Sequence, residues 1–387
     1  MSVTAARGFA AAGVHAGIRR KGRDLALVRS TVPATGAAMF TANRVLAAPV
    51  VVSKRHVAGA EPQAIVINSG VANAATGERG ELDALATAAE AGRLLDLHAE
   101  EVLVLSTGVI GAPLPLEKVL GGLRQAVPTL SAAGGADAAE AILTTDTKTK
   151  EAVVELDGFT VGGMAKGSGM IHPQLATMLA VVTTDYPLEP DEAIEFLRPA
   201  VERSFNSISV DGECSTNDAV CLLANGASGV ARTPASDSAF ALALGRVCEQ
   251  LAEQIVADGE GATVLAEIEV SGAADPAQAR AIASRIATSP LVKTALFGHD
   301  ANWGRVLAAA GSAPFNGGFA AVDPALVTLS YNGTTVLERG VPLGVEPDVS
   351  NGSCRIELDL GLGPGAASYL TSDLSYDYVR INADYRS

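Results

Sequence analysis

Short apolar runs, separated by stretches with helical spacing of apolar residues, set the pattern of this chain. Continuous apolar runs at Ala64–Asn68, Glu101–Ser106 and Met178–Val182 predict strands buried on both faces. Apolar positions with helical spacing predict amphipathic helices over Glu81–Leu95 and from Phe240 to Ile255. The pattern by itself therefore supports a mixed α/β fold.

Shorter or less regular apolar patterns predict further strands and helices. Strands are expected at Asp24–Val28, Ala37–Phe40, Pro49–Lys54, Glu151–Leu156, Phe159–Val161, Val264–Val270, Leu326–Leu329 and Cys354–Leu360. Helices are expected at Leu116–Leu123, at Asp137–Leu143 and after Asp275-Pro276. At 387 residues the chain is long enough for two structural units. We place them at 1–262 and 263–387, the second being a smaller α+β unit.

Composition and charge narrow the classes of partner. The net charge of −15 argues against nucleic acid or an anionic membrane as a partner, and no 18-residue apolar span occurs in the chain. The four cysteines show neither a CxxC pair nor metal-site spacing with the five histidines. We expect reduced thiols, no metal and a location in the cytoplasm, since no apolar signal segment precedes a cleavage site.

The dipeptide Ala176-Thr177, at the start of the third buried run, admits two interpretations. Thr177 fits the first position of a buried strand simply as a strand former. Alternatively, its hydroxyl group attacks the Ala176 carbonyl and releases a new chain that begins with Thr177. A free N-terminal threonine carries its own base, because an α-amino group titrates near ~7.7–8.

The surrounding motif resembles a known processing site. Residues Lys166-Gly-Ser-Gly-Met-Ile-His-Pro-Gln-Leu-Ala-Thr-Met-Leu179 are similar to the self-cleavage site of the glutamate N-acetyltransferases, also called ornithine acetyltransferases, of arginine biosynthesis. Ser106-Thr-Gly-Val-Ile-Gly111 and the tail Tyr378–Ser387 resemble further motifs of that family, in the same order. Departures from the family pattern occur at Val71, Ala75, Ala301 and Asp384. The resemblance favours cleavage between Ala176 and Thr177, giving an alpha chain 1–176 and a beta chain 177–387.

The resemblance also implies a set of site residues. The Thr107 hydroxyl and the Gly108 amide would form an oxyanion hole, which acyl transfer requires because negative charge develops on a carbonyl oxygen. By the same resemblance, the residues that would contact the substrates are Thr144, Lys166, Thr177, Glu260, Asn382 and Ser387. Taken alone, each residue type has an ordinary explanation: a strand end at Thr107-Gly108, a helix-end hydroxyl at Thr144, surface charges at Lys166 and Glu260, and a frayed C-terminus.

The fold implied by the resemblance is a layered α/β/β/α sandwich of the self-processing amidase type. The implied reaction passes the acetyl group of N2-acetylornithine to glutamate through an acetyl-threonine, giving ornithine and N-acetylglutamate. Acetyl-CoA is a possible additional donor. The family implies no cofactor, small-molecule substrates, and a heterotetramer of two alpha and two beta chains.

Two other functions compete with the acetyltransferase. A self-processing aminopeptidase or amidase of the same fold would pass the acyl group to water, although the tail motif favours the transferase. The glycine-rich run Gly162–Gly169 could instead cradle a phosphate, but the spacing of a P-loop is absent. The polar stretch Ser204–Asp218 lacks a Gly-x-Ser-x-Gly elbow. The motif at 289–305 matches the family without suggesting a chemical role.

Overall fold

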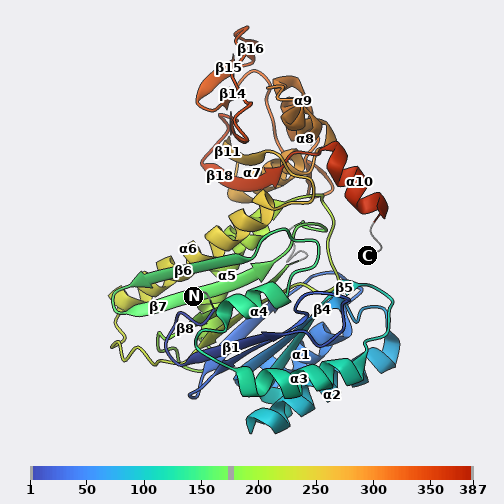
Figure 1. Ribbon diagram of the computed structural model, residues 1–387. Coiled ribbons are helices and arrows are strands. Elements are labelled where there is room, and N and C mark those ends of the chain that lie inside the picture. Colours follow the sequence, from blue (N-terminus) through green and yellow to red (C-terminus); the bar gives the residue numbers. More distant parts are fainter. Residues whose placement is uncertain (1–2, 173–177, 385–387) are drawn as a thin grey trace.

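The computed structural model describes residues 3–172 and 178–384 (Figure 1). Two β-sheets lie face to face in the first two thirds of the chain. One has the strand order β1-β2-β4-β5 and the other the order β3-β10-β8-β7-β6. The first comprises β1 (Phe9–Val14), β2 (Leu25–Ser30), β4 (Ala64–Val71) and β5 (Val102–Val109). The second comprises β3 (Thr35–Phe40), β10 (Ala219–Ala224), β8 (Leu179–Thr184), β7 (Phe159–Lys166) and β6 (Lys150–Leu156).

The side-chain alternation along the strands divides the sandwich into its layers. Ile65 and Leu103 from the first sheet share a buried cluster with Leu179 and Val181 from the second, so this cluster fills the space between the sheets. Their neighbours Val66 and Val104 point the other way, toward helices. The predicted buried strands and the layered sandwich are therefore confirmed.

Helices cover both outer faces. On the outer face of the first sheet lie α2 (Gly77–Leu95) and α3 (Leu116–Ala126). Helix α4 (Gly135–Ala141) packs against β1 on the other side and contributes to the cluster between the sheets. On the second sheet lie α5 (Ala193–Arg203) and α6 (Pro234–Ala257), which cover the apolar faces of β7, β8 and β10.

One predicted strand is wrong. Pro49–Lys54 is the first half of a helix, α1 (Ala48–Gly59), which packs along β5. Its run of valines has high strand propensity, but Pro49 fits the first turn of a helix, where its missing N–H has no partner to lose. Val52 and His56 are buried one turn apart, so tertiary packing selects the helix over the local preference.

The remaining residues build a second sheet-and-helix layer. Its sheet has the order β16-β15-β14-β17-β11-β18-β9 and is covered by α7, α8 and α9. The strands are β9 (Ile208–Ser209), β11 (Leu265–Ala273), β14 (Thr328–Tyr331), β15 (Thr334–Glu338), β16 (Val341–Pro342), β17 (Ser353–Asp359) and β18 (Gly365–Ser372), with a separate hairpin of β12 (Pro314–Phe315) and β13 (Gly318–Phe319). The helices are α7 (Pro276–Ala287), α8 (Pro290–Phe297) and α9 (Trp303–Ala310).

Two connections tie this layer to the sandwich. Strand β9, from the first part of the chain, pairs with β18, so the division at residue 263 stays a prediction. The last helix, α10 (Tyr376–Asp384), leaves the second layer and points back toward the sandwich (Figure 1). Among the described helices, none is both long and apolar enough to cross a membrane.

Candidate active site

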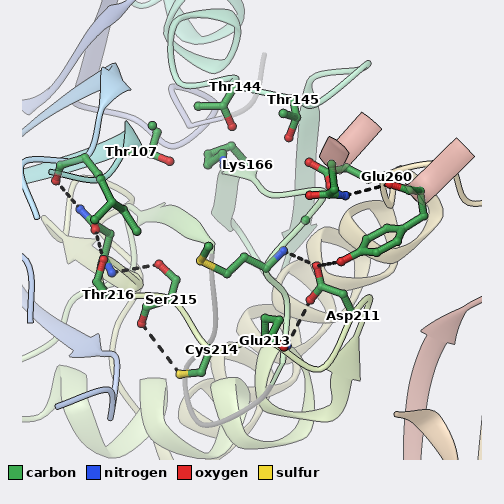
Figure 2. Close-up of a pocket in the computed structure, with 18 residues that line it drawn as sticks. Thr107, Thr144, Thr145, Lys166, Asp211, Glu213, Cys214, Ser215, Thr216 and Glu260 are labelled. Atoms are coloured by element: carbon green, nitrogen blue, oxygen red, sulfur yellow. Dashed lines mark hydrogen bonds between the residues drawn. The ribbon is translucent and has the colours of Figure 1, made fainter. Parts of the chain in front are cut away.

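A cavity of about 200 Å³ lies where several chain segments converge beside the sandwich (Figure 2). The end of β5, the turn after α4, the end of β7, the loop before β10, the turn after α6 and the helix α10 all contribute to its wall. Its lining residues include Thr107, Gly108, Thr144, Lys166, Glu260 and Asn382. Residues that are far apart in the sequence thus meet around one space.

The Thr107-Gly108 pair stands at the end of β5, where the pairing with β4 becomes irregular. Gly108 has a φ of +131°, in a region that side chains rarely allow. A Cβ atom there would lie 2.3 Å from the carbonyl carbon of Gly70, so only glycine fits. The close approach of β4 and the left-handed backbone fix the direction of the Gly108 amide, as a preorganised oxyanion hole requires.

Asn217 braces this strand end from the opposite sheet. Its side-chain amide is buried and donates to the carbonyl groups of Ala72 (2.7 Å) and Ser106 (2.9 Å). Ser106 directly precedes Thr107, and its hydroxyl group donates to Asn68 Oδ1 at 2.6 Å. Buried hydrogen bonds of the Asn68 and Asn217 side chains therefore connect the end of β5 to β4 and to the loop before β10.

Lys166, the last residue of β7, supplies a buried positive charge. Its side chain is 4 % exposed, and its ammonium nitrogen lies 3.9 Å from Asp146 Oδ2, an ion-pair contact longer than a hydrogen bond. Within residues 3–172 and 178–384, the ammonium group has no hydrogen-bond acceptor. Burial lowers the pKa of Lys166, although the Asp146 carboxylate opposes this. The N–H donors are thus available to an anionic group in the cavity.

Carboxylates line the opposite side of the cavity from Thr107 (Figure 2). Asp211 accepts hydrogen bonds from the backbone N–H groups of Met170 (2.5 Å) and Ile171 (2.8 Å). Tyr378 of α10 donates to the same carboxylate at 3.3 Å, and burial raises the pKa of Asp211. Asp211 therefore joins the glycine-rich turn after β7 to the C-terminal helix.

Met178, the first described residue after the gap, lies beside the oxyanion candidate. Its backbone N–H donates to Asp218 Oδ1 at 3.0 Å. Met178 and Asp218 line a small second cavity together with Thr107 and Lys166. Burial raises the pKa of Asp218 well above its usual value, and its Oδ2 finds no hydrogen-bond partner among the described residues.

The family model described as the ArgJ family matches residues 10–387. The chain belongs to the ArgJ family.

Curated relatives carry the name "Arginine biosynthesis bifunctional protein ArgJ". The one from Symbiobacterium thermophilum is 46% identical over 400 residues, covering 100% of this chain and 98% of the relative. The one from Mycolicibacterium paratuberculosis is 48% identical over 397 residues, covering 100% of this chain and 96% of the relative. The resemblance noted in the sequence is therefore confirmed over the whole chain.

Solved structures give shorter matches. An ornithine acetyltransferase from Mycobacterium tuberculosis, complexed with ornithine, is 43% identical with a TM-score of 0.44, covering 45% of this chain and 95% of that one. An L-aminopeptidase D-Ala-esterase/amidase from Ochrobactrum anthropi is 12% identical with a TM-score of 0.39, covering 67% of this chain and 86% of that one.

Most of the residues expected at the site of this ArgJ-family chain surround one cavity. Thr107, Gly108, Thr144, Lys166, Glu260 and Asn382 all line it. Ala176, Thr177 and Ser387 lie outside the described residues. The catalytic and binding roles of these residues remain predictions. Within the described part of the chain, no group of three or more His, Cys, Asp or Glu side chains is arranged to hold a metal.

Three polar residues with buried side chains at this site, Asp146, Asn217 and Asp218, were not predicted from the sequence. Each lies in a polar stretch that was noted, Thr144–Lys148 or Ser204–Asp218, without a reason to single it out. Burial is the missing signal, since a buried amide or carboxylate needs partners that only the fold supplies. The four cysteines are free thiols, and one of them, Cys214, lines the cavity.

Proposed function

We propose that this chain transfers the acetyl group of N2-acetylornithine to glutamate through an acetyl ester on Thr177, as a self-processed enzyme of arginine biosynthesis. The observation that carries the proposal is the shared small cavity of Thr107, Lys166 and Met178. It brings an oxyanion candidate and a buried cation, whose ammonium group has no hydrogen-bond acceptor among the described residues, to the residue that follows Thr177. Membership of the ArgJ family supports the same reaction.

The first half-reaction opens the amide of acetylornithine. The Thr177 hydroxyl oxygen attacks the acetyl carbonyl carbon while the α-amino group of Thr177 takes the hydroxyl proton. The Thr107 hydroxyl and the Gly108 N–H donate to the oxygen that becomes negative. When the tetrahedral species collapses, the C–N bond breaks and the same proton passes to the leaving ornithine nitrogen, leaving acetyl-threonine.

The second half-reaction reverses these steps with glutamate. Its α-amino group attacks the ester carbonyl, and the Thr177 oxygen leaves and regains a proton. Both substrates carry an α-carboxylate next to the reacting nitrogen, so one cation serves both, and Lys166 is the candidate. Thr144, Glu260, Asn382 and Ser387 would bind the remaining polar groups of the two amino acids.

The proposed cut leaves the sandwich connected. Cleavage between Ala176 and Thr177 falls between β7 and β8, which are antiparallel neighbours in one sheet. Their ladder and the core on both faces would hold the alpha and beta chains together. We extend the proposal to two copies of each chain per assembly. Four free thiols fit a reducing compartment, and we propose the cytoplasm.

A double-displacement assay tests the transferase. Incubation with acetylornithine alone should add one acetyl group to the 177–387 fragment, and initial-rate lines with glutamate should be parallel. Intersecting lines without an acetylated fragment would refute the ester intermediate.

The choice of acceptor and donor distinguishes the competing functions. A hydrolase would release acetate at a rate that glutamate does not change, which would replace the transferase with the amidase alternative. Acetyl-CoA serves as a separate donor in a parallel assay, because the relatives are named as bifunctional proteins. Acetylation of the fragment by acetyl-CoA would establish the second activity in this chain.

A further inference from the structure

Four buried charged side chains form an alternating row that ends at the cavity. Lys150 lies between two carboxylates, with its ammonium nitrogen 2.7 Å from Asp146 Oδ1 and 2.6 Å from Asp258 Oδ2. Asp146 also faces Lys166, at 3.9 Å. The four side chains are at most 7 % exposed, so water screens them little. Their order is Asp258, Lys150, Asp146, Lys166, and the last of these lines the cavity.

Asp146 connects the two turns that carry substrate-binding candidates. Its Oδ2 accepts the backbone N–H of Thr144 at 3.0 Å. Its Oδ1 accepts the backbone N–H of Gly167, the residue after Lys166, at 2.6 Å. One carboxylate thus fixes the turn after α4 and the turn after β7, and supplies a negative charge beside the Lys166 ammonium group.

The charges that face Lys166 come from four segments. Burial lowers its pKa; Asp146 opposes this most strongly, Lys150 adds to the lowering, and Asp218 and Glu260 oppose it more weakly. Burial disfavours the charged form of Asp146 as well, but Lys166 and Lys150 more than offset this and hold its pKa well below the usual value.

The other two carboxylates are poorer counter-ions. Burial raises the pKa of Asp218 well above its usual value, so this group holds its proton to higher pH. Glu260 accepts a hydrogen bond from the Asn382 side chain at 2.8 Å, and it opposes the lowering of the Lys166 pKa more weakly than Asp146 does. Of these three carboxylates, Asp146 is the one that combines a buried side chain, a lowered pKa and hydrogen bonds to both turns.

We propose that Asp146 is a positioning residue that keeps Lys166 protonated and aimed at the substrate carboxylate while holding Thr144 against the same space. The inference rests on the proposed acetyl transfer. It assigns the charge state of the cavity to a residue that lines neither of the two cavities at the site. A substrate carboxylate would complete the alternation of charges at the free end of the row.

The Asp146→Asn variant tests this through the pH dependence of KM for acetylornithine, whose α-nitrogen is an amide and does not titrate. Without the Asp146 charge, burial and Lys150 lower the Lys166 pKa further, so Lys166 loses its proton as pH rises. We expect the ratio of variant to wild-type KM to increase toward high pH, by up to about tenfold per pH unit, the limit for one proton. The ratio removes contributions that the two proteins share, including the Thr177 amine.

Asp258→Asn is the matched control. It removes the same charge from the same row and also releases Lys150, but Asp258 does not contact Lys166. Its KM should run parallel to the wild type across the pH range. If Asp258→Asn shows the same pH dependence as Asp146→Asn, or if Asp146→Asn stays parallel to the wild type, the inference is overturned.

A second variant keeps the inference testable if Asp146→Asn folds poorly. Asp146→Asn combined with Lys150→Met removes the like charge that lowers the Lys166 pKa. The pH dependence should then be weaker than in Asp146→Asn and still steeper than in the wild type. A double variant that folds and matches the wild type also overturns the inference. Failure of the wild type to transfer acetyl groups would instead refute the proposed function, so the two failures are distinct.

Discussion

Asn382 donates from its side-chain amide to Glu260 Oε2 at 2.8 Å, joining the C-terminal helix to the turn after α6. No residue of α10 is buried, and Tyr376 and Val379 are 83% and 63% exposed. The helix is therefore placed by polar contacts with the cavity wall more than by apolar packing. Contacts of this kind break at low cost, so the tail can be removed without opening a core.

Removal of residues 382–387 should leave self-cleavage intact and cripple acetyl transfer. Cleavage needs the local turn, Thr177 and the oxyanion candidates, whereas transfer needs an amino acid held against the acetyl-threonine. Misplacement by about 1 Å can cost on the order of 10²-fold in rate. Turnover of the cleaved, folded truncation with acetylornithine and glutamate measures this.

Val379→Ala is the control for the tail, because it changes an exposed side chain of the same helix and should alter nothing. Wild-type turnover and Michaelis constants in the truncation would remove Asn382 and Ser387 from the proposed site. A change of acceptor from glutamate to water would show that the tail selects the transferase reaction.

Gly108→Ala should lower kcat by about 10²–10³-fold, the effect of losing one oxyanion donor. Both the φ of +131° and the 2.3 Å approach to Gly70 force the backbone to move, which turns the amide away. Gly111→Ala is a matched control, since Gly111 also has a positive φ of +80° but no atom within 4 Å of its added Cβ. Steady-state rates of the two variants decide the matter. Equal losses would mean that backbone strain, and not the position of the Gly108 amide, causes the effect.

The layers of the fold were predictable from the sequence because buried strands and amphipathic helices have different periods. Ala64–Asn68, Glu101–Ser106 and Met178–Val182 all lie in or next to strands of the sandwich. The strand predicted at Pro49–Lys54 was wrong, because a continuous run of valines shows neither helical nor strand periodicity. The helix there is selected by contacts with β5.

The site was predictable only in part, and for a different reason. Thr107, Lys166 and Glu260, which line the cavity, were predicted through the family motifs, because no local pattern gives these residue types a role. Asn217 and Asp146 were missed because they bond residues outside their own stretch: Asn217 donates to Ala72, 145 residues away, and Asp146 accepts the N–H of Gly167, 21 residues away. Such contacts exist only in the fold.

Purified protein should consist of fragments 1–176 and 177–387, the second beginning with Thr177. The Thr177 hydroxyl is the attacking group, so Thr177→Ala should stay uncut and inactive, while Thr177→Ser should still cut slowly. Intact mass spectrometry reads each outcome. Thr183→Ala, in the following strand, is a control that keeps the Ala176-Thr177 bond and should still be cut. A single uncleaved chain with full activity would refute the self-cleavage mechanism.

Asn217→Asp should lower kcat with little change in KM. The substitution keeps the shape but places a carboxylate oxygen against the carbonyls of Ala72 and Ser106, which lose their donors. An unsatisfied buried carbonyl costs about 1–3 kcal/mol, so the end of β5 should shift and carry Thr107 with it. The oxyanion forms only in the transition state, and a displaced donor therefore reduces kcat and kcat/KM together.

Asn225→Asp separates this effect from a general loss of stability. Asn225 follows the other end of β10, and its amide likewise donates to two groups, Arg7 O at 3.0 Å and Ser30 Oγ at 3.2 Å. Both variants should melt at a lower temperature than the wild type, but only Asn217→Asp should lose turnover per folded molecule. Equal kcat in the two variants would mean that Asn217 only holds the two sheets together and does not position the oxyanion donors. A loss confined to Asn217→Asp would mean that the bond between the sheets also sets the position of the oxyanion donors, so that the fold and the catalytic geometry depend on the same amide.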